Sequence, residues 1–409
     1  MRGHIKKRSS WEYVAELGSQ PVQRCPACRR RFWVRRNRLA SCPLCHGPLQ
    51  ETIERRQQLK AGFKTKREAQ EALTKVMGTV ATGTYIALSK VLLRDFLNEE
   101  WLPAIKSTIR PTTYLSYAGH VKRHINPALG ALPLQHLSPS HINAFYSRLL
   151  AEGRGEGKGG LAPATVRRVH ATLHRALRDA FRWNKITRSP ADAADPPRSS
   201  YGPEMKVWSA EELRKFLGAE RETRLYALWL LSATTGMRRG EAVGLTWENV
   251  DLEAKRVAIR KTLVVTGYQP QVSEPKTRKG RRLIDLDQAT VAALKQQRKR
   301  QKEERLAWGP LWKDTGYVFT REDGEPYHPE RISKLFIQTA KKAGLPRIRL
   351  HDLRHTYATL AMGADIRAKV VSERLGHANI GITLDIYSHA VPALSEEAAS
   401  RVAALVVPR

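Results

Sequence analysis

The sequence of 409 residues contains no apolar run long enough to cross a membrane. The longest run, from Leu225 to Leu231, falls well short of the ~20 residues that a spanning helix needs. The N-terminal segment from Met1 to Ser10 is basic, and it lacks the apolar stretch that a secretory signal peptide requires. These two absences exclude a membrane protein and a cleaved secretory signal.

Acidic residues are scarce relative to basic ones. The chain has 39 Asp+Glu against 71 Lys+Arg, which gives a formal net charge of +32 and a sequence pI near 10.4. This surplus favours a polyanionic partner, for which nucleic acid is the common explanation and an acidic membrane surface the alternative. Hydrophobic residues make up 41% of the chain, which excludes extensive disorder. At roughly 100–200 residues per domain, the length indicates two to four domains.

Only four cysteines are present, and they form two CxxC pairs, Cys25 with Cys28 and Cys42 with Cys45. Four thiolates can surround one Zn²⁺ tetrahedrally, so we predict a structural zinc ribbon with these four ligands. The alternatives are two disulfides, unpaired thiols, a thioredoxin-like redox pair and a catalytic metal site. Disulfides are disfavoured without a secretory signal, the redox pair lacks a surrounding βαβ pattern, and four thiolates leave no open position for catalysis.

The N-terminal segment carries a disproportionate share of the positive charge. Residues 1–60 hold 14 Lys/Arg and 4 Asp/Glu, a net of +10 (14 − 4), which indicates a DNA-contacting module in its own right. Alternating polarity predicts strands at Trp11 to Leu17 and at Leu49 to Leu59, with the zinc ribbon (about 22–48) inserted between them.

A helix is predicted to follow the second strand. Thr65 is a suitable N-cap, and Glu68 lies three positions later, at the spacing of a capping box. We assign residues 1–80 to this first domain and expect Lys64 and Lys66 to contact DNA.

The region from 88 to 195 is predicted to be an all-helical domain. Apolar residues at three- and four-residue spacing define four helices, Val91 to Trp101, Pro111 to Ile125, Ser138 to Ala151 and Pro163 to Trp183. Within them, two apolar stripes are expected, one formed by Leu115, Val121 and Ile125 and one by Val169, Leu173 and Leu177.

The last of these helices is rich in basic residues, among them Arg167, Arg168 and Arg175. A solvated helix face is one interpretation, but the global charge favours a surface that contacts DNA phosphates. The segment from Pro190 to Pro203 is rich in Pro, Ala and Ser, which is typical of a linker, and we place the linker at 196–205.

The region from 206 to 409 has mixed α and β patterns. Ser209 and Glu212 form a second capping box. Helices are predicted at Leu225 to Ser232, Asp287 to Trp308, Glu330 to Ala343 and His351 to Gly363, strands at Val257 to Val265 and Arg281 to Asp287 around a turn at Glu274 to Gly280, and an amphipathic tail at Ala393 to Val407.

Five short motifs in this region occur together in one order. They are Thr235-Gly236-Met237-Arg238-Arg239-Gly240-Glu241, Pro275-Lys276-Thr277, His351-Asp352-Leu353-Arg354-His355, Leu375-Gly376-His377, and Tyr387, ten residues after His377. This series resembles the arginine box, mobile lysine loop, HxxR box, LGH box and nucleophile of the tyrosine recombinase (phage integrase) family. Each motif alone is a weak signal, whereas five in register are a strong one.

The resemblance extends over nearly the whole chain. The helical middle is similar to the family's core-binding domain, and the segment from Gly62 to Leu73 resembles the arm-type DNA-binding domain. It implies a multidomain α+β fold with a sheet-and-helix N-terminal domain, an all-α core-binding domain and a mainly α catalytic domain with a small antiparallel sheet. The cysteine segment departs from an ordinary arm-binding domain.

The chemistry of phosphodiester cleavage explains the residue types in these motifs. Without a metal, cleavage needs a nucleophile, neutralisation of the pentacoordinate phosphate and an acid for the leaving oxygen. Arg238 and Arg354 suit the second role, because a guanidinium grips two phosphate oxygens and keeps its charge. A Tyr phenol has a pKa near 10, so Tyr387 needs nearby cations or a base in order to attack.

The resemblance assigns the remaining roles. It implies a 3′-phosphotyrosyl enzyme on Tyr387 and a free 5′-hydroxyl, with Lys276 protonating the leaving oxygen. His351 and His377 would assist proton transfer or hold the phosphate, and Glu241 would orient Arg238. Because the phosphotyrosyl bond conserves the energy of the broken linkage, neither ATP nor a catalytic metal is implied.

Other interpretations of the same residues stay open at this stage. Arg238 could simply pair with Glu241 on a helix, and Arg239 is expected at the surface. His351, His355 and His377 could bind a metal, although the HExxH pattern of a zinc hydrolase is missing. Tyr357 is a rival nucleophile, but its apolar helical surroundings favour core packing. His389 is either a further phosphate contact or a residue without a role.

Partners and location follow from the resemblance. It implies double-stranded DNA with core and arm attachment sites, a homotetramer on DNA, and an excisionase or host DNA-bending protein as accessory factors, in the bacterial cytoplasm at the nucleoid. The tail would dock either on its own domain or on a neighbouring protomer. Two other functions are separable from recombination: a type IB topoisomerase, which the arm-like domain and tail disfavour, and a non-catalytic zinc-ribbon DNA-binding protein, which the complete motif set disfavours.

Overall fold

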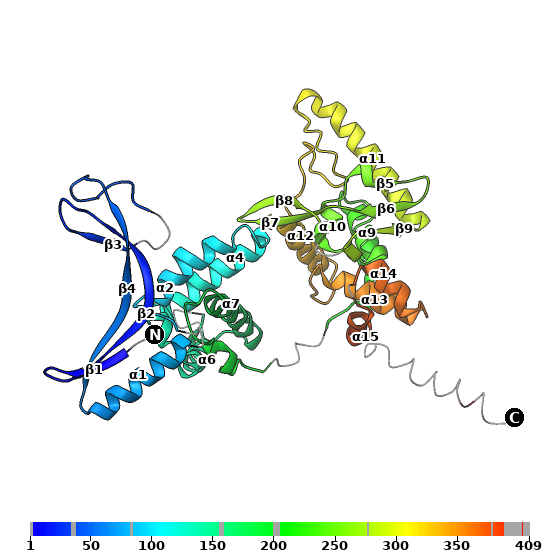
Figure 1. Cartoon of the computed structure of the whole chain (residues 1–409). Helices are drawn as coiled ribbons and strands as arrows, with labels where there is room; N and C mark the ends of the chain where they lie inside the picture. Colours follow the sequence, from blue (N-terminus) through cyan, green and yellow to red (C-terminus); the bar gives the residue numbers. More distant parts are fainter. Residues whose placement is uncertain are drawn as a thin grey trace. The chain divides into compact units, whose positions relative to one another are not determined.

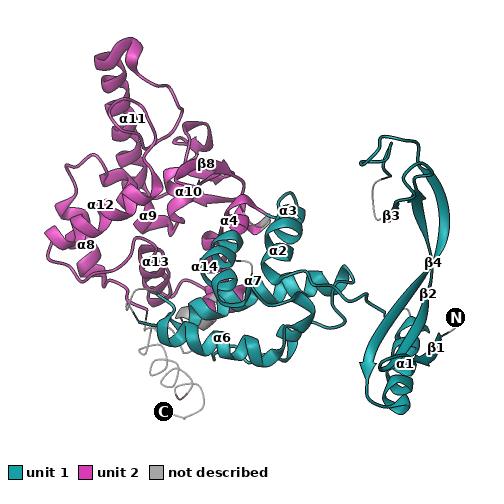
Figure 2. Ribbon diagram, turned by 90° about the vertical axis from the view of Figure 1, so that its left-hand side faces the viewer, with its two compact units in different colours: residues 1–109, 116–198 teal, residues 110–115, 199–409 magenta. Residues whose placement is uncertain are grey.

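The chain divides into two compact units, which Figure 2 colours separately. The first comprises residues 1–109 and 116–198, and the second comprises 110–115 and 199–409. No helix in the described part of the chain is both long enough and apolar enough to span a bilayer. The structure, a computed structural model, describes residues 3–33, 38–81, 85–154, 159–198, 205–275, 278–377, 379–387 and 403.

A long antiparallel pair of strands forms the N-terminal sheet (Figure 1). Strands β2 (Trp11–Arg24) and β4 (Gln50–Phe63) pair along their length. Strand β1 (Gly3–Lys7) joins the first half of β2, and β3 (Arg31–Trp33) joins its last residues. Both predicted strands are confirmed, but each is longer than expected. The register shifts beside Gly18, whose φ of 95° allows a bulge, so β2 bends where it was expected to end.

Helix α1 (Lys66–Ala81) covers one half of this sheet. Its Leu73 packs with Tyr13 and Ala15 of β2 in a small apolar core. The predicted capping box is present, because the Glu68 backbone N–H donates to Thr65 Oγ1 at 3.2 Å and the Thr65 N–H donates to Glu68 Oε2 at 3.4 Å. The other half of the sheet, together with the cysteine pairs, is called the distal ribbon here (residues 19–33 and 38–55).

The four predicted helices of the middle region are present, and two of them contain π-helical turns. The segments are α2 (Leu93–Asp95), a π-helix at Phe96–Trp101, α3 (Leu102–Ile105), α4 (Pro111–His120), a π-helix at Val121–Ile125, α5 (Asn126–Leu129), α6 (Pro139–Glu152) and α7 (Pro163–Arg182). Val169, Leu173 and Leu177 are fully buried, as predicted.

One expectation for this region is wrong. Leu115 is 43% exposed, although Val121 and Ile125 are buried. Six residues correspond to about 1.7 helical turns, so Leu115 and Val121 point to different sides of the helix. The segment Pro190–Ala193 is a 3₁₀-helix with Pro190 and Ala191 buried, and it packs against α6 and α7. The linker predicted at 196–205 includes residues 199–204, which lie outside the described residues.

The second unit is built around the buried helix α9 (Tyr226–Thr235), whose Leu228, Trp229 and Leu231 lie in the main apolar core. Its other segments are α8 (Ala210–Ala219), α10 (Arg239–Val243), β5 (Val250–Asp251), β6 (Arg256–Ile259), β7 (Thr262–Thr266), β8 (Gln269–Ser273), β9 (Arg282–Asp285), α11 (Gln288–Trp308), α12 (Pro329–Lys342), α13 (Asp352–Gly363), α14 (Ala368–Leu375) and α15 (Ile380–Tyr387). The Ser209–Glu212 capping box is confirmed.

The β structure of this unit differs from the prediction in one respect. The expected single strand from Val257 to Val265 is two strands, β6 and β7, with different partners. Strand β6 lies between β5 and β9, whereas β7 forms a hairpin with β8, which was not predicted. The polar residues at 260–261 separate the two strands, and alternating polarity does not reveal which strand pairs with which.

Candidate active site

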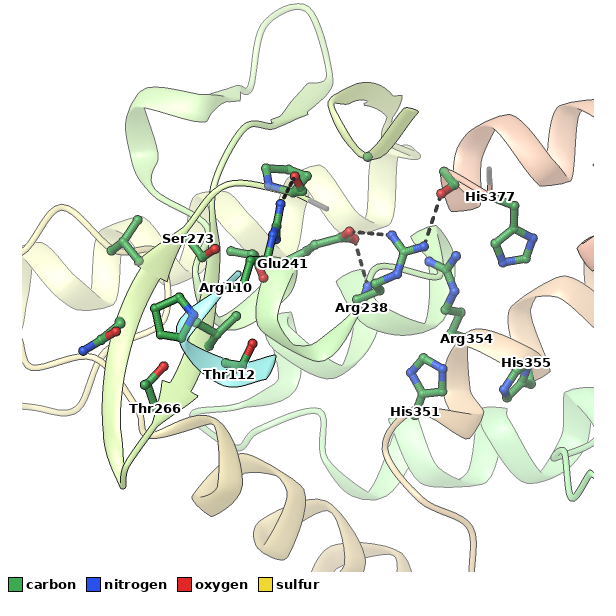
Figure 3. Close-up of a pocket in the computed structure, with 18 residues that line it drawn as sticks. Arg110, Thr112, Arg238, Glu241, Thr266, Ser273, His351, Arg354, His355 and His377 are labelled. Atoms are coloured by element: carbon green, nitrogen blue, oxygen red, sulfur yellow. Dashed lines mark hydrogen bonds and ion pairs between the residues drawn. The ribbon is translucent and has the colours of Figure 1, made fainter. Parts of the chain in front are cut away.

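Residues from four of the five motifs line one cavity of about 640 Å³. Its wall includes Arg238, His351, Arg354, His355 and His377 (Figure 3). These residues come from α10, α13 and the turn after α14, which are far apart in the sequence. The structure thus brings together four of the six predicted catalytic residues, and adds His355, which was considered only as a metal ligand.

Arg238 is held at the start of α10 by the turn that precedes it. Helix α9 ends at Gly236 in the left-handed conformation (φ 63°). A Cβ atom at this position would lie 2.6 Å from Leu375 Cδ2 and 2.7 Å from Tyr357 Cδ1. Glycine is therefore required for two reasons: the backbone is left-handed, and there is no room for a side chain. Arg238 Nη1 then donates to Glu241 Oε1 at 2.8 Å, and Nη2 donates to the Gly376 carbonyl at 3.2 Å.

Arg354 is buried, with 3% of its surface exposed. Its Nη1 donates to the carbonyl oxygen of Gly236 at 2.8 Å, and Nη2 donates to that of Leu375 at 2.6 Å. Carbonyl oxygens carry no formal charge, so these two bonds orient the guanidinium without neutralising it. Two guanidiniums that line one cavity are suited to hold two oxygens of a phosphate.

Two imidazoles beside these arginines have strongly lowered pKa values. Partial desolvation in the cavity, followed by the charges of His355 and Arg354, lowers the pKa of His351 to about 4. Burial, followed by Arg354 and Arg238, lowers the pKa of His377 to about 4, and His377 Nδ1 lies 2.8 Å from Thr383 Oγ1. At neutral pH both rings are uncharged, so each offers one donor and one acceptor.

Glu241 is buried between two guanidiniums. Besides Arg238, it is held by Arg282 of β9, whose Nη2 donates to Oε2 at 2.8 Å and whose Nη1 donates to Oε1 at 3.2 Å. Burial alone would raise the pKa of Glu241, but hydrogen bonds and charge from Arg282, and then the charge of Arg238, lower it overall. The sequence did not lead us to predict a functional role for Arg282. Its one signal was alternation, because it lies two residues before the buried Ile284 and therefore on the same face of the strand.

Two predicted catalytic groups fall partly or wholly outside what the structure describes. Lys276 lies outside the described residues, but Pro275 and Gly280 on either side of its segment line the cavity. For Tyr387 only the backbone is described, at the end of α15, which packs against α13 and α14. His389 and the tail from Ala393 to Val407 lie outside the described part, apart from Ala403.

The competing interpretations can be compared with the geometry. Tyr357 is half-buried, and its hydroxyl accepts a hydrogen bond from Arg374 Nε at 2.7 Å, which supports a packing role. Arg239 is half-buried and donates to Ser333 Oγ at 2.9 Å, so the expectation of a surface position is only partly correct. Among the described residues, the three imidazoles His351, His355 and His377 do not form a group spaced to hold a metal.

The residues predicted to contact DNA are all exposed: Lys64, Lys66, Arg167, Arg168 and Arg175. The guanidinium groups of Arg167 and Arg175 each lie close to an oxygen atom of the same chain. Arg167 Nη1 donates to the Pro197 carbonyl at 3.1 Å, and Arg175 Nε lies 3.6 Å from an Asp179 carboxylate oxygen.

The four cysteines converge in the distal ribbon. Their sulfur atoms all lie within 4.8 Å of one another, with Cys25 and Cys45 at 3.3 Å and Cys28 and Cys42 at 3.6 Å. A disulfide would need about 2.05 Å, whereas ligands of a tetrahedral Zn²⁺ at about 2.3 Å lie about 3.8 Å apart. The cysteines are free thiols whose spacing is compatible with a zinc site.

The two cysteine pairs also have matching backbones. The Cys25 N–H donates to the Arg30 carbonyl, and the Cys42 N–H donates to that of Gly47, both at 2.9 Å. The residue after each second cysteine has a positive φ, 57° at Arg29 and 56° at His46. Each pair thus forms the same tight turn, which directs both sulfur atoms to one point.

Two family models and several known proteins match this chain. Residues 206–393 match the phage integrase family, and residues 93–150 match the phage integrase N-terminal SAM-like domain. The chain is 28% identical to the tyrosine recombinase XerC-like protein of Caldanaerobacter subterraneus subsp. tengcongensis, covering 80% of this chain and 87% of that protein. It is 23% identical to the ICEBs1 integrase of Bacillus subtilis, covering 85% and 89%.

Solved structures with the same fold include two integrases bound to DNA. The Tn1549 transposon integrase in complex with a circular intermediate DNA aligns with a TM-score of 0.63 at 21% identity, covering 76% of this chain and 99% of that one. A lambda integrase bound as a tetramer to a Holliday junction aligns with a TM-score of 0.54 at 16% identity, covering 94% of each chain.

Proposed function

The chain belongs to the phage integrase family of tyrosine recombinases, and from this we propose how its own residues cut and rejoin DNA. It is a site-specific DNA recombinase that acts in DNA integration. The observation that carries the proposal is the joint anchoring of two arginines. Arg238 and Arg354 donate to the carbonyls of consecutive residues, Gly376 and Leu375, beside the neutral rings of His351 and His377.

In the cleavage step, the scissile phosphate lies between Arg238 and Arg354. The phenolic oxygen of Tyr387 attacks phosphorus, and the bond from phosphorus to the 5′-oxygen breaks. Lys276 gives its proton to this oxygen, so that the products are a 3′-phosphotyrosyl enzyme and a free 5′-hydroxyl. The proton that the Tyr387 hydroxyl loses passes to the neutral ring of His351 or His377, and the other ring donates a hydrogen bond to the phosphate as its charge rises.

Strand transfer reverses this chemistry with a different 5′-hydroxyl. The hydroxyl from the second DNA partner attacks the phosphorus and gives its proton to Lys276, while the bond from phosphorus to the Tyr387 oxygen breaks and that oxygen regains the proton held by the histidine. One exchange gives a Holliday junction, and a second pair of cleavages resolves it. One ester replaces another at every step, so the reaction needs no nucleotide and no catalytic metal.

The rest of the chain binds and arranges the DNA. We assign residues 1–80 to arm sites with Lys64 and Lys66, and 88–195 to the core site with Arg167, Arg168 and Arg175. A linker follows at 196–205, and 206–409 form the catalytic domain with its tail. The related lambda integrase forms a tetramer on a Holliday junction, and four copies of this chain would assemble likewise, with an excisionase or a host DNA-bending protein as accessory factor.

The cysteine cluster would hold one structural Zn²⁺ through Cys25, Cys28, Cys42 and Cys45. Four thiolates complete its coordination, so the ion stabilises the fold and takes no part in cleavage. The matching turns of the two cysteine pairs support this assignment.

The proposal is tested with a DNA site selected by the protein itself. Duplexes are first selected from a random-sequence pool by binding to Tyr387→Phe protein. The selected duplex is then nicked at successive positions, because a nick just beyond the cleavage point lets the short 5′-hydroxyl strand diffuse away and traps the covalent adduct. Wild-type protein in EDTA should form an adduct that survives denaturant on a gel, and Tyr387→Phe should form none.

Two results would contradict this mechanism: an adduct with Tyr387→Phe, or wild-type cleavage that stops when EDTA removes divalent cations. Relaxation of a supercoiled plasmid without the selected site would instead favour a topoisomerase. Binding without any adduct on any nicked duplex would favour a non-catalytic DNA-binding protein.

A further inference from the structure

Arg282 is hydrogen-bonded to one of the motifs that form the site and to residues that lie close to two others in the sequence. Its side chain is 7% exposed. Nε donates to the carbonyl of Arg374 near the end of α14 at 2.6 Å, and Nη1 donates to the carbonyl of Gly280, in the segment after Lys276, at 3.2 Å. The same guanidinium donates hydrogen bonds to both carboxylate oxygens of Glu241. One side chain therefore links the arginine box, the lysine segment and the turn that carries His377.

The charges in this cluster explain why a second arginine is needed. Glu241 carries one negative charge in a buried position between Arg238 and Arg282, so the three groups together carry a net charge of +1. If Arg282 were neutral, Arg238 and Glu241 would form a pair with no net charge. The attraction of Glu241 for Arg238 would then compete directly with that of a phosphate, because buried charges are weakly screened.

We propose that Arg282 is a positioning residue for DNA cleavage: it takes up the charge of Glu241, so that Arg238 remains available to the scissile phosphate. Its bonds to Gly280 and Arg374 also fix the ends of the segments that carry Lys276 and His377. This inference rests on the proposed function, since it assigns Arg238 to the phosphate. It requires no contact between Arg282 itself and the DNA.

A purely structural ion pair makes a different prediction, and a double-variant cycle separates the two. Arg282→Gln, Glu241→Gln and the double variant are compared with wild type for the rate of adduct formation on the selected nicked duplex, at protein concentrations that saturate binding. We expect Arg282→Gln to be slower than wild type by about 10²-fold. The double variant should be about tenfold faster than Arg282→Gln, because removing the carboxylate charge releases Arg238.

Arg282→Lys keeps the charge and loses the planar fork, so its rate should lie between those of wild type and Arg282→Gln. Arg256→Gln is the matched control, since Arg256 pairs with Asp285 on the same sheet but is exposed, and its rate should equal that of wild type. The melting temperature and DNA affinity of each variant are measured alongside, to confirm that the folded protein is compared at saturation.

A double variant as slow as Arg282→Gln, or slower, would overturn the proposal. If Arg282→Gln does not fold, the lysine variant decides. A folded Arg282→Lys protein whose rate falls by less than about tenfold supports the charge role, and one whose rate falls by about tenfold or more contradicts it. Loss of the adduct in Tyr387→Phe tests the proposed function separately, so the two can fail independently.

Discussion

The guanidinium of Arg354 donates a hydrogen bond of 2.6 Å to the backbone carbonyl of Leu375. The next carbonyl along the chain, that of Gly376, accepts a bond from Arg238. The last residue of α14 and the residue that follows it therefore each hold one arginine through a backbone carbonyl, and His377 comes next in the chain. Small movements of these residues would change the geometry of the whole phosphate site, which makes it sensitive to substitutions that add no charge.

Substituting Arg354 should separate cleavage from binding. Arg354→Lys keeps a positive charge but cannot reach both carbonyls and the phosphate with one fork, so we expect adduct formation to fall by at least about 10²-fold. Affinity for the selected duplex, measured by fluorescence anisotropy, should stay within about threefold, because the proposed DNA contacts at exposed residues such as Arg168 would supply most of the binding. Equal losses of binding and cleavage would contradict this division of roles.

Arg168 should contribute to affinity alone. It is exposed on α7, and if it contacts a phosphate, Arg168→Gln should reduce the slope of log Kd against log salt by about one. The rate of adduct formation at saturating protein should be unchanged. An unaltered salt slope would show that this face of α7 is merely solvated.

The conformation of Gly236 should make it intolerant of alanine. Its φ is 63°, and an added Cβ would lie 2.6 Å from Leu375 and 2.7 Å from Tyr357. We expect Gly236→Ala to lower the free energy of unfolding by about 1–3 kcal/mol and to slow cleavage, because Arg354 binds the Gly236 carbonyl. Gly218→Ala in α8 is the control, since no atom lies within 4 Å of its Cβ position; similar urea midpoints for both variants would refute the expectation.

The stability of the catalytic unit should depend on pH through His351 and His377. Both have folded-state pKa values lowered to about 4, against about 6.5 in an unfolded chain. Between these values the unfolded state binds more protons, so stability is retained above pH 6.5 and is lost as the pH falls toward 4. Melting temperatures from pH 7.5 to 4.5 should fall less steeply for a His351→Gln/His377→Gln double variant than for wild type.

His136 is exposed, so His136→Gln serves as the control for the pH dependence of the melting temperature. Equal pH dependence in wild type and the double variant would show that other groups cause the loss of stability.

Removal of metal should unfold the distal ribbon and leave the rest of its sheet intact. The residues buried in the ribbon are few, chiefly Val22, Gln23, Cys25 and Cys42, so the sulfur–metal bonds would supply most of its stability. We expect about one zinc per chain by elemental analysis. After chelation, hydrogen exchange should accelerate in residues 19–33 and 38–55, whereas α1 and the strands beneath it, which share a separate apolar core, should remain protected. Equal protection with and without metal would make the cysteines dispensable.

Local features of the fold could be predicted because they depend on neighbours in the sequence. The capping boxes at Thr65 and Ser209 need only a partner three residues away, and the buried stripe of α7 follows from helical periodicity alone. The strand partners could not be predicted in the same way. Strand β8 was missed because its sequence, Gln-Pro-Gln-Val-Ser, has almost no apolar residues and therefore no alternating pattern, and its pairing with β7 depends on the hairpin.

By itself, the sequence determined the family, the order of the motifs and the identity of most candidate catalytic residues, because motif spacing is a property of the chain. Only the tertiary structure decided how these residues are held. Glu241 and Arg282 lie 41 positions apart and meet through four atoms, and Arg354 is held by the carbonyls of Gly236 and Leu375, which are far apart in the sequence. Such contacts depend on the path of the chain through space, and the energy of a buried charge depends on every group packed around it.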